Sequence, residues 1–115
     1  MPNVVTYKKL WDSTAIAATE TEIYEADTTS TTGVVKNISA VITNTTAAGI
    51  TVEVWMKATS ATAAADSNKL INSEVVPANG RLPFTVPDMS DNNILTATGS
   101  GTGLTIHCTS GIVIN

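Results

Sequence analysis

One histidine and one cysteine stand side by side, and they are the residues in this sequence best suited to nucleophilic catalysis. His107 and Cys108 lie in the alternating stretch 104–109, Leu-Thr-Ile-His-Cys-Thr. A catalytic Cys–His pair needs both side chains within hydrogen-bonding reach of each other. Neighbouring side chains on a strand point to opposite faces, so we expect a half-buried cysteine and a surface histidine. The sequence therefore predicts a protein that is not an enzyme.

A second segment concentrates oxygen-bearing side chains. Four of them fall within six positions: Asp88, Asp91, Asn92 and Asn93. Calcium prefers oxygen ligands, but this spacing matches no calcium-binding loop, and Asp and Asn favour turns because they hydrogen-bond to nearby backbone. One Cys and one His cannot build a structural zinc site by themselves. We therefore predict a turn here, with no metal site and no cofactor.

The composition favours a single β-rich domain. Hydrophobic residues make up 43% of the 115 residues, which argues against wholesale disorder, and this length has room for one domain. Charged residues make up only 14%, about half of the usual share. Twenty Thr, eleven Val and ten Ile stand against five Leu. Because β-branched side chains suit strands and are stiff in helices, this is a strand-forming composition.

Charge and hydropathy exclude two classes of partner. The net charge is −4 and the six Lys and Arg residues are scattered, with only Lys8 and Lys9 adjacent, so there is no basic stripe to neutralise phosphates and we expect no nucleic acid partner. Apolar runs fall far short of the roughly 20 residues that cross a bilayer. The start, Met1-Pro2-Asn3, lacks the pattern of a signal peptide. We expect no membrane span, and one cysteine cannot form an internal disulfide.

Two segments alternate between apolar and polar side chains, as half-buried strands do. The predicted inner row of the first is Val34, Ile38, Ala40 and Ile42. The predicted inner row of the second is Ile50, Val52, Val54 and Met56, with Thr51, Glu53, Trp55 and Lys57 facing outward. The segment 44–49 reverses the chain between them, so we predict a β-hairpin.

Turn residues divide the remaining chain into further short strands. Asn79-Gly80 is a strong hairpin signal because both residues tolerate positive φ, and Pro83 marks an edge strand. About eight short strands with turns every 8–12 residues are typical of a sandwich or small barrel. We predict an all-β fold, a single antiparallel β-sandwich of jelly-roll or immunoglobulin-like type with an N-terminal arm.

Residues 1–18 differ from the rest of the chain. The segment 3–11 has strand character, Asp12-Ser13-Thr14 is a polar break, and 15–18 are small residues too few to hold a helix alone. We predict an N-terminal arm or, alternatively, an edge strand over 1–18, and a β-sandwich domain over 19–115. If residues 1–18 are an arm, the domain should fold without them.

Three aromatic residues are candidate contacts for a partner. Trp55 faces outward by alternation, and tryptophan is enriched at interface hot spots. Tyr7 and Trp11 lie in the N-terminal segment of a chain that is only 4% aromatic, which suggests that this segment is anchored to something. For Trp55 two alternatives remain open: a place in the core of the second sheet, or stacking on a sugar together with Tyr24.

The succession of turns and strands resembles that of small β-sandwich structural proteins of tailed bacteriophages, of the capsid decoration or cement type. The resemblance covers roughly residues 23–114. It is carried by Val34-Val35-Lys36-Asn37-Ile38, Asn44-Thr45, Val52-Glu53-Val54-Trp55, Val75-Val76-Pro77-Ala78-Asn79-Gly80, Asp91-Asn92-Asn93-Ile94-Leu95-Thr96-Ala97 and Ser110-Gly111-Ile112-Val113-Ile114.

The resemblance implies a virion component without catalytic activity, assembled in the host cytoplasm. We expect a capsid decoration protein that docks on the outer shell through its N-terminal arm and stabilises it. Its partners would be itself, as a homotrimer, and the major capsid protein or another virion protein. The first alternative is a neck, tail or head-fibre component. The second, from a different class, is a carbohydrate-binding β-sandwich module.

Overall fold

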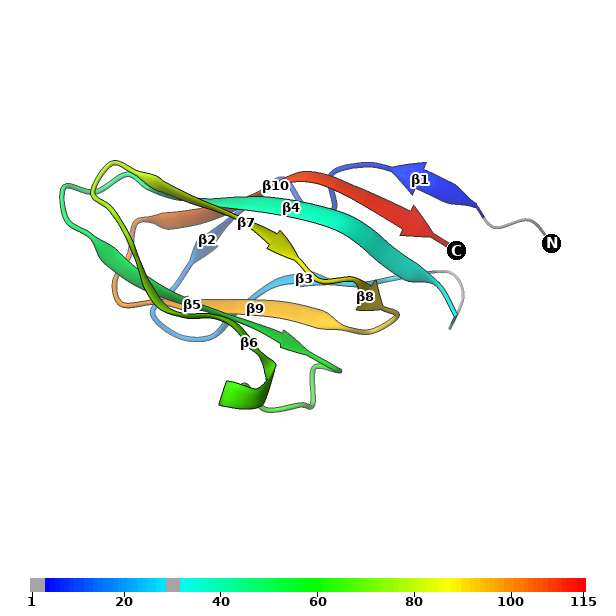
Figure 1. The fold of residues 1–115 in the computed structure, drawn as a ribbon. Coiled ribbons are helices and arrows are strands. Elements are labelled where there is room, and N and C mark those ends of the chain that lie inside the picture. Colours follow the sequence, from blue (N-terminus) through cyan, green and yellow to red (C-terminus); the bar gives the residue numbers. More distant parts are fainter. Residues whose placement is uncertain (1–3, 29–31) are drawn as a thin grey trace.

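The chain forms a sandwich of two antiparallel β-sheets in the computed structural model, which describes residues 4–28 and 32–115 (Figure 1). Sheet A contains β1 (Val5–Tyr7), β2 (Ser13–Ile16), β4 (Val34–Asn44), β7 (Arg81–Val86), β8 (Met89–Ser90) and β10 (Leu104–Ile114). Sheet B contains β3 (Thr21–Glu25), β5 (Ile50–Lys57), β6 (Lys69–Val76) and β9 (Ile94–Gly99), and a 3₁₀ turn, Asp66–Asn68, precedes β6. The predicted all-β antiparallel sandwich is confirmed.

The pairing pattern is that of a jelly roll. β1 and β2 pair with the last strand, β10; β3 pairs with β9, β4 with β7 and β8, and β5 with β6. The chain is thus folded back on itself as one long ribbon, and successive pairs of strands alternate between the two sheets. If β1 and β2 are counted as one interrupted strand, and β7 and β8 as another, the ten strands become the eight of a jelly roll.

Two connections predicted as hairpins cross between the sheets instead. β4 and β5 lie in sheets A and B, and so do β7 and β6 on either side of Asn79-Gly80. The local prediction at that turn holds, since Asn79 has a φ of 52°. The pairing was wrong because a turn fixes only the reversal of the chain. Which sheet the next strand joins depends on where its apolar face finds cover.

The core lies between the sheets, and a bulge corrects the predicted inner row of β4. Three of its predicted members are buried: Ile38, Ala40 and Ile42. Val35, not Val34, continues this row. Asn37 lies between Val35 and Ile38 with a φ of 52°, at a shift in register against β10. The extra residue of a bulge moves the alternation by one position.

The inner row of β5 begins as predicted and its last residues differ. Ile50, Val52 and Val54 are buried, whereas Met56 is half-buried. Lys57 was predicted to face outward and lies on the same face of sheet B as Trp55, yet it is only 7% exposed. Its ammonium group forms an ion pair of 2.8 Å with Glu20, and this partner is what makes the burial of a charge tolerable.

Every strand of sheet A is interrupted at the same level. Residues 8–12 separate β1 from β2, and residues 87–88 separate β7 from β8. Between them, β10 and β4 shift register over 108–112 and 36–39. These interruptions form a band across sheet A. On one side of the band sheet A faces sheet B, and on the other side lies a tip made of β1, β8 and the adjoining ends of β4 and β10. Figure 1 shows β1 at the end of the molecule where the C-terminus lies.

Residues 4–18 run along one edge of sheet A, whereas residues 1–3 lie outside the described residues. β1 and β2 both pair with β10, which is the edge-strand arrangement. Ile16 is 2% exposed and belongs to the core. Leu10 packs where Gly111 has no side chain. Pro83 also lies on an edge strand, since β7 pairs only with β4. The division into 1–18 and 19–115 stays a prediction.

Candidate interaction surfaces

His107 and Cys108 do not form a catalytic pair. Cys108 is buried, and its Sγ accepts a hydrogen bond from the backbone N–H of Leu10 at 3.4 Å. His107 is half-buried on the opposite side of β10, with Nε2 3.2 Å from the Thr43 hydroxyl. The predicted alternation is confirmed, and the imidazole cannot activate this thiol across the strand.

The oxygen-rich segment serves turns, as predicted. Asp91 accepts hydrogen bonds from the backbone N–H and the hydroxyl of Thr28 at 3.0 and 3.1 Å. Asn93 accepts one from the backbone N–H of Ser90 at 2.8 Å, and Asp88 lies 3.6 Å from Lys36. Within residues 4–28 and 32–115, no cluster of three or more His, Cys, Asp or Glu could hold a metal ion. No helix in the same ranges is long and apolar enough to span a membrane.

Trp11 is held by its own domain. Its indole N–H donates a hydrogen bond to the carbonyl of Ile106 at 3.2 Å, and its ring lies 5.7 Å from that of Tyr24. Both rings pack against the core, and burial together with the charge of Asp27 raises the pKa of Tyr24. The two rings close the side of the sandwich where β2 and β3 lie. A partner contact for Trp11 stays a prediction, with less free surface available than at Tyr7.

Exposed apolar side chains gather on β1. Val4, Val5 and Tyr7 are 61%, 48% and 76% exposed. Val5 pairs with Ile114 and Tyr7 with Ile112, both half-buried residues of β10. Because paired residues share a face of the sheet, we call Val5, Tyr7, Ile112 and Ile114 the β1 patch. Contiguous exposed apolar side chains of this kind mark interaction sites.

Trp55 lies on the outer face of sheet B, half-buried, where it pairs with Thr96 and Lys69. The Lys69 ammonium group lies 5.6 Å from the ring centroid, within range of a cation–π interaction. It also pairs with Glu53 at 2.6 Å and Asp66 at 3.4 Å. The hydrogen bond to Glu53 is the main cause of the raised pKa of Lys69. The indole is therefore held in place beside a network of charges.

Trp55 and Tyr24 lie on opposite faces of sheet B. Tyr24 pairs with the buried Leu95, whereas Trp55 pairs with the next residue, Thr96. Two rings on opposite faces cannot stack on one sugar. The carbohydrate-binding alternative thereby loses the aromatic platform on which it depended.

A second ion pair lies on the same face as Trp55. Lys57 donates a hydrogen bond to Glu20, and this bond is the main cause that holds the pKa of the Glu20 carboxyl below its usual value. Both lysines of sheet B, Lys57 and Lys69, therefore have carboxylate partners inside the chain.

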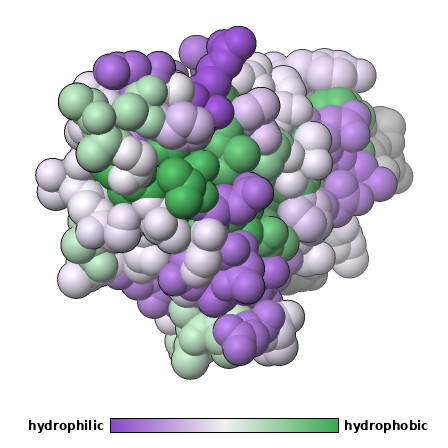
Figure 2. All heavy atoms as spheres, turned by 60° about the vertical axis from the view of Figure 1, so that its left-hand side comes forward, coloured by the Kyte–Doolittle hydropathy of each residue, from purple (hydrophilic) through white to green (hydrophobic). Residues whose placement is uncertain are grey.

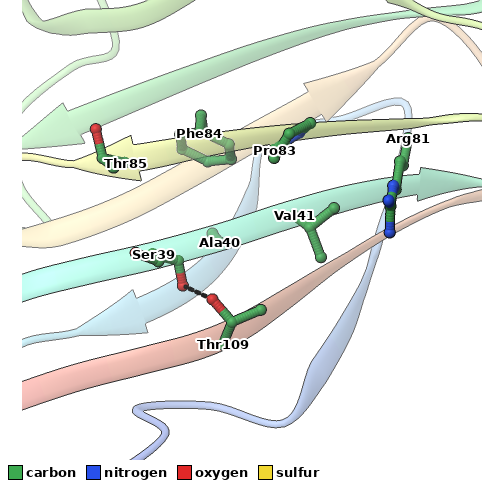
Figure 3. Close-up of a pocket in the computed structure, with 8 residues that line it drawn as sticks. All are labelled: Ser39, Ala40, Val41, Arg81, Pro83, Phe84, Thr85 and Thr109. Carbon is green, nitrogen blue, oxygen red and sulfur yellow. Dashed lines mark hydrogen bonds between the residues drawn. The ribbon is translucent and has the colours of Figure 1, made fainter.

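The outer face of sheet A is built mainly from small side chains around a shallow hollow. One row across the strands is Ser13, His107, Val41 and Pro83. The hollow has a volume of about 550 Å³ over β4 and β7. Its lining residues include Ser39, Val41, Arg81, Pro83, Thr85 and Thr109 (Figure 3). The Thr109 hydroxyl donates a hydrogen bond to the carbonyl of Ser39 at 3.1 Å, and Arg81 lies at one end.

Sequence reasoning did not find this hollow. The outward row of β4 is readable from the alternation, but nothing local says that Pro83 of β7 lies beside Val41. Apolar surface reaches solvent elsewhere too: on the side carrying the β4–β5 and β6–β7 connections, Figure 2 shows a central apolar band bordered by polar atoms. Two further small hollows over sheet A adjoin the first, sharing Thr109 and Ser39 with it.

No protein-family model matches the sequence, and no match is found among curated proteins. Two solved structures are similar in fold. One is described as part of Bacillus endospore appendages, a family of disulfide-linked pili; it has a TM-score of 0.56 and 21% identity, over 97% of this chain and 87% of that one. The other belongs to infectious bursal disease virus, Gx strain, with a TM-score of 0.50 and 11% identity, over 99% of this chain and 33% of that one. At these identities the likeness establishes the fold.

Proposed function

We propose that this chain is a non-enzymatic structural subunit of a phage virion, which docks on the outer shell of the capsid and stabilises it. The β1 patch carries the proposal. It concentrates exposed apolar side chains at one end of an elongated molecule, with principal extents of 52 × 27 × 17 Å. An apolar patch at one end of the molecule suits attachment to a larger body and leaves the outer face of sheet B open.

The surface composition supports an assembling role. Ordering small side chains such as Thr and Ser costs little rotamer entropy, and entropy lost at an interface subtracts directly from affinity. The fold is shared with a pilus subunit and a virus protein. The partners would be the major capsid protein or another virion protein, and other copies of this chain, for which the phage resemblance implies a homotrimer.

A neck, tail or head-fibre component is the second candidate. The similarity to a pilus subunit favours it, because that similarity covers 97% of this chain. In this role the β1 patch would contact another fibre subunit or the fibre base instead of the shell.

Immunogold labelling tests the location. Antibodies against the purified protein should label the heads of phage particles released by the organism that encodes the chain. Label on tails or fibres would select the second candidate. Label confined to appendages of the cell surface would contradict a virion role altogether.

Rebinding tests the β1 patch. Capsids stripped of this protein should rebind the wild-type chain, and Tyr7→Lys should bind at least tenfold more weakly. Thr6→Lys is the matched control. Thr6 is exposed and pairs with Val113, so its side chain points to the face of β1 opposite to that of Tyr7. Equal binding by both variants would remove the patch from the attachment site.

A further inference from the structure

Charges without an ion pair in the described part of the chain are separated between the two sheets. The unpaired cations lie at the edges of sheet A: Lys8 and Lys9 directly after β1, and Arg81 at the start of β7. The unpaired strand carboxylates lie on the edge strands of sheet B: Glu22 and Glu25 on β3, and Glu74 on β6. The remaining unpaired Asp side chains are in connecting loops: Asp27, Asp91 and Asp12, which shares the β1–β2 loop with Lys8 and Lys9. Sheet A of one copy thus complements sheet B of another.

The complementary charges also match in spacing. β2 and β3 share one side of the sandwich, joined by residues 17–20, and β6 and β7 share the other side, joined by residues 77–80. Each sheet is four strands wide, so its outer strands are about 14 Å apart. A sheet A laid over a sheet B with their strands aligned brings Lys8 and Lys9 toward Glu22 and Glu25 on β3.

The hollow of sheet A and Trp55 of sheet B lie at corresponding positions. β4 and β5 are each third in order from the β1–β3 side. Asn44 donates a hydrogen bond to the carbonyl of Val76, which pairs with Ile50, so Asn44 and Ile50 lie at one level. Ser39, which lines the hollow, lies five residues before Asn44, and Trp55 lies five residues after Ile50. Both are therefore about equally far from the β4–β5 connection. The indole is thus placed above the hollow of a copy stacked in register.

We propose that copies of this chain associate face to face, with sheet B of one copy on sheet A of the next and Trp55 inserted in the hollow over β4 and β7. Glu22 and Glu25 then face Lys8 and Lys9 of the neighbour. Lys69 holds the indole in place before contact, which lowers the entropy cost of ordering it. The inference rests on the proposed function only in taking the chain to be an assembling subunit.

Such a contact is heterologous, because two different surfaces meet. The two surfaces lie on opposite faces of one sandwich, so each added copy leaves one of each kind free and the stack stays open. Open growth distinguishes this contact from the homotrimer implied by the phage resemblance.

Two complementary variants test the contact. Trp55→Ala removes the inserted side chain but keeps the hollow, and Val41→Arg fills the hollow but keeps Trp55. In light scattering over a dilution series, the wild-type mass should rise with concentration beyond a dimer, and each variant should associate at least tenfold more weakly. Mixed in equal amounts, the variants should form a 1:1 dimer that does not grow, since only one intact contact remains.

Charge reversal gives a test that leaves Trp55 in place. Lys9→Glu and Glu22→Lys should each weaken association about tenfold, and the double variant should restore most of it, because Glu22 pairs with Thr96 on the face that carries Trp55. Asp27→Lys is the control for Glu22→Lys, because it makes the same change in net charge in the exposed β3–β4 connection. Association should also weaken with added salt.

Several outcomes would overturn the inference. They are a wild-type chain that stays monomeric at millimolar concentration, a mass fixed at three copies, or folded Trp55→Ala and Val41→Arg variants that associate like wild type. Circular dichroism and thermal unfolding establish that each variant is folded. Tyr7→Ala separates this inference from the proposed function: it should lose capsid binding and keep self-association, so either property can fail alone.

Discussion

The indole N–H of Trp11 donates a hydrogen bond to the backbone carbonyl of Ile106 across 95 positions of sequence, at 3.2 Å. Trp11 lies between β1 and β2, and Ile106 belongs to the last strand. The bond therefore joins the first segment of the jelly roll to the last, beside the ring contact between Trp11 and Tyr24.

Trp11→Phe should lower the free energy of unfolding by about 1 kcal/mol, the usual net worth of one such hydrogen bond. The aromatic packing is largely retained, so the loss reports mainly on the N–H donor. Urea unfolding followed by circular dichroism measures it. Tyr7→Phe is the control and should be neutral, because Tyr7 is 76% exposed; an unchanged Trp11→Phe would show that the bond contributes nothing.

Two N-terminal truncations should behave differently. Removing residues 1–9 deletes only β1, which is exposed throughout, and should leave cooperative unfolding intact. Removing residues 1–18 also deletes β2 and the buried Ile16, and loss of one buried isoleucine side chain alone costs about 3 kcal/mol. We expect the longer truncation to lose its cooperative transition. If its urea midpoint matched that of the full chain, residues 19–115 would be an independent domain and 1–18 an arm.

Stability should depend on Glu20 at acid pH. Its pKa is lowered in the folded state, chiefly by the hydrogen bond from Lys57. The contribution of Glu20 is therefore present above its unfolded pKa, near 4.5, and is lost as pH falls through the lower folded value. Glu20→Gln should be less stable than wild type at pH 7, and the difference should shrink below pH 4. Urea midpoints measured between pH 3 and 7 check this, and a constant difference would mean that the carboxylate charge is irrelevant.

Cys108 should not link copies of this chain by disulfides in the native state. Its thiol is 1% exposed and its Sγ accepts the Leu10 N–H, although the similar pilus family is described as disulfide-linked. Non-reducing electrophoresis of oxidised protein should show monomer. A thiol reagent should react only in denaturant; rapid reaction without denaturant would contradict the burial.

Gly103→Ala should destabilise the β9–β10 connection by about 2 kcal/mol, since strained positive φ typically costs about 1–3 kcal/mol. Gly103 has a φ of +118°, and an added Cβ would collide with Thr46. Gly101→Ala is the matched control, because nothing lies within 4 Å of its added Cβ. Thermal unfolding of both variants measures the difference, and equal stability would show that the connection adjusts freely.

The sequence by itself determined the fold class and much of the core. β-branched composition and period-two alternation follow from local sterics and burial on one face, so Ile38, Ile42, Val52 and Val54 were assigned correctly. The same alternation placed Cys108 inside and Trp55 outside. These assignments depend only on residues adjacent in the chain.

Tertiary structure decided what local patterns do not encode. A bulge at Asn37 moved the inner row to Val35, because β4 has one more residue than its partner β10 between two successive pairs of the ladder. Both predicted hairpins became crossings between sheets, since strand pairing is settled by contacts between residues far apart in sequence. The hollow beside Val41 and the separation of charge between the sheets exist only once β4 and β7 lie side by side and the two sheets are stacked.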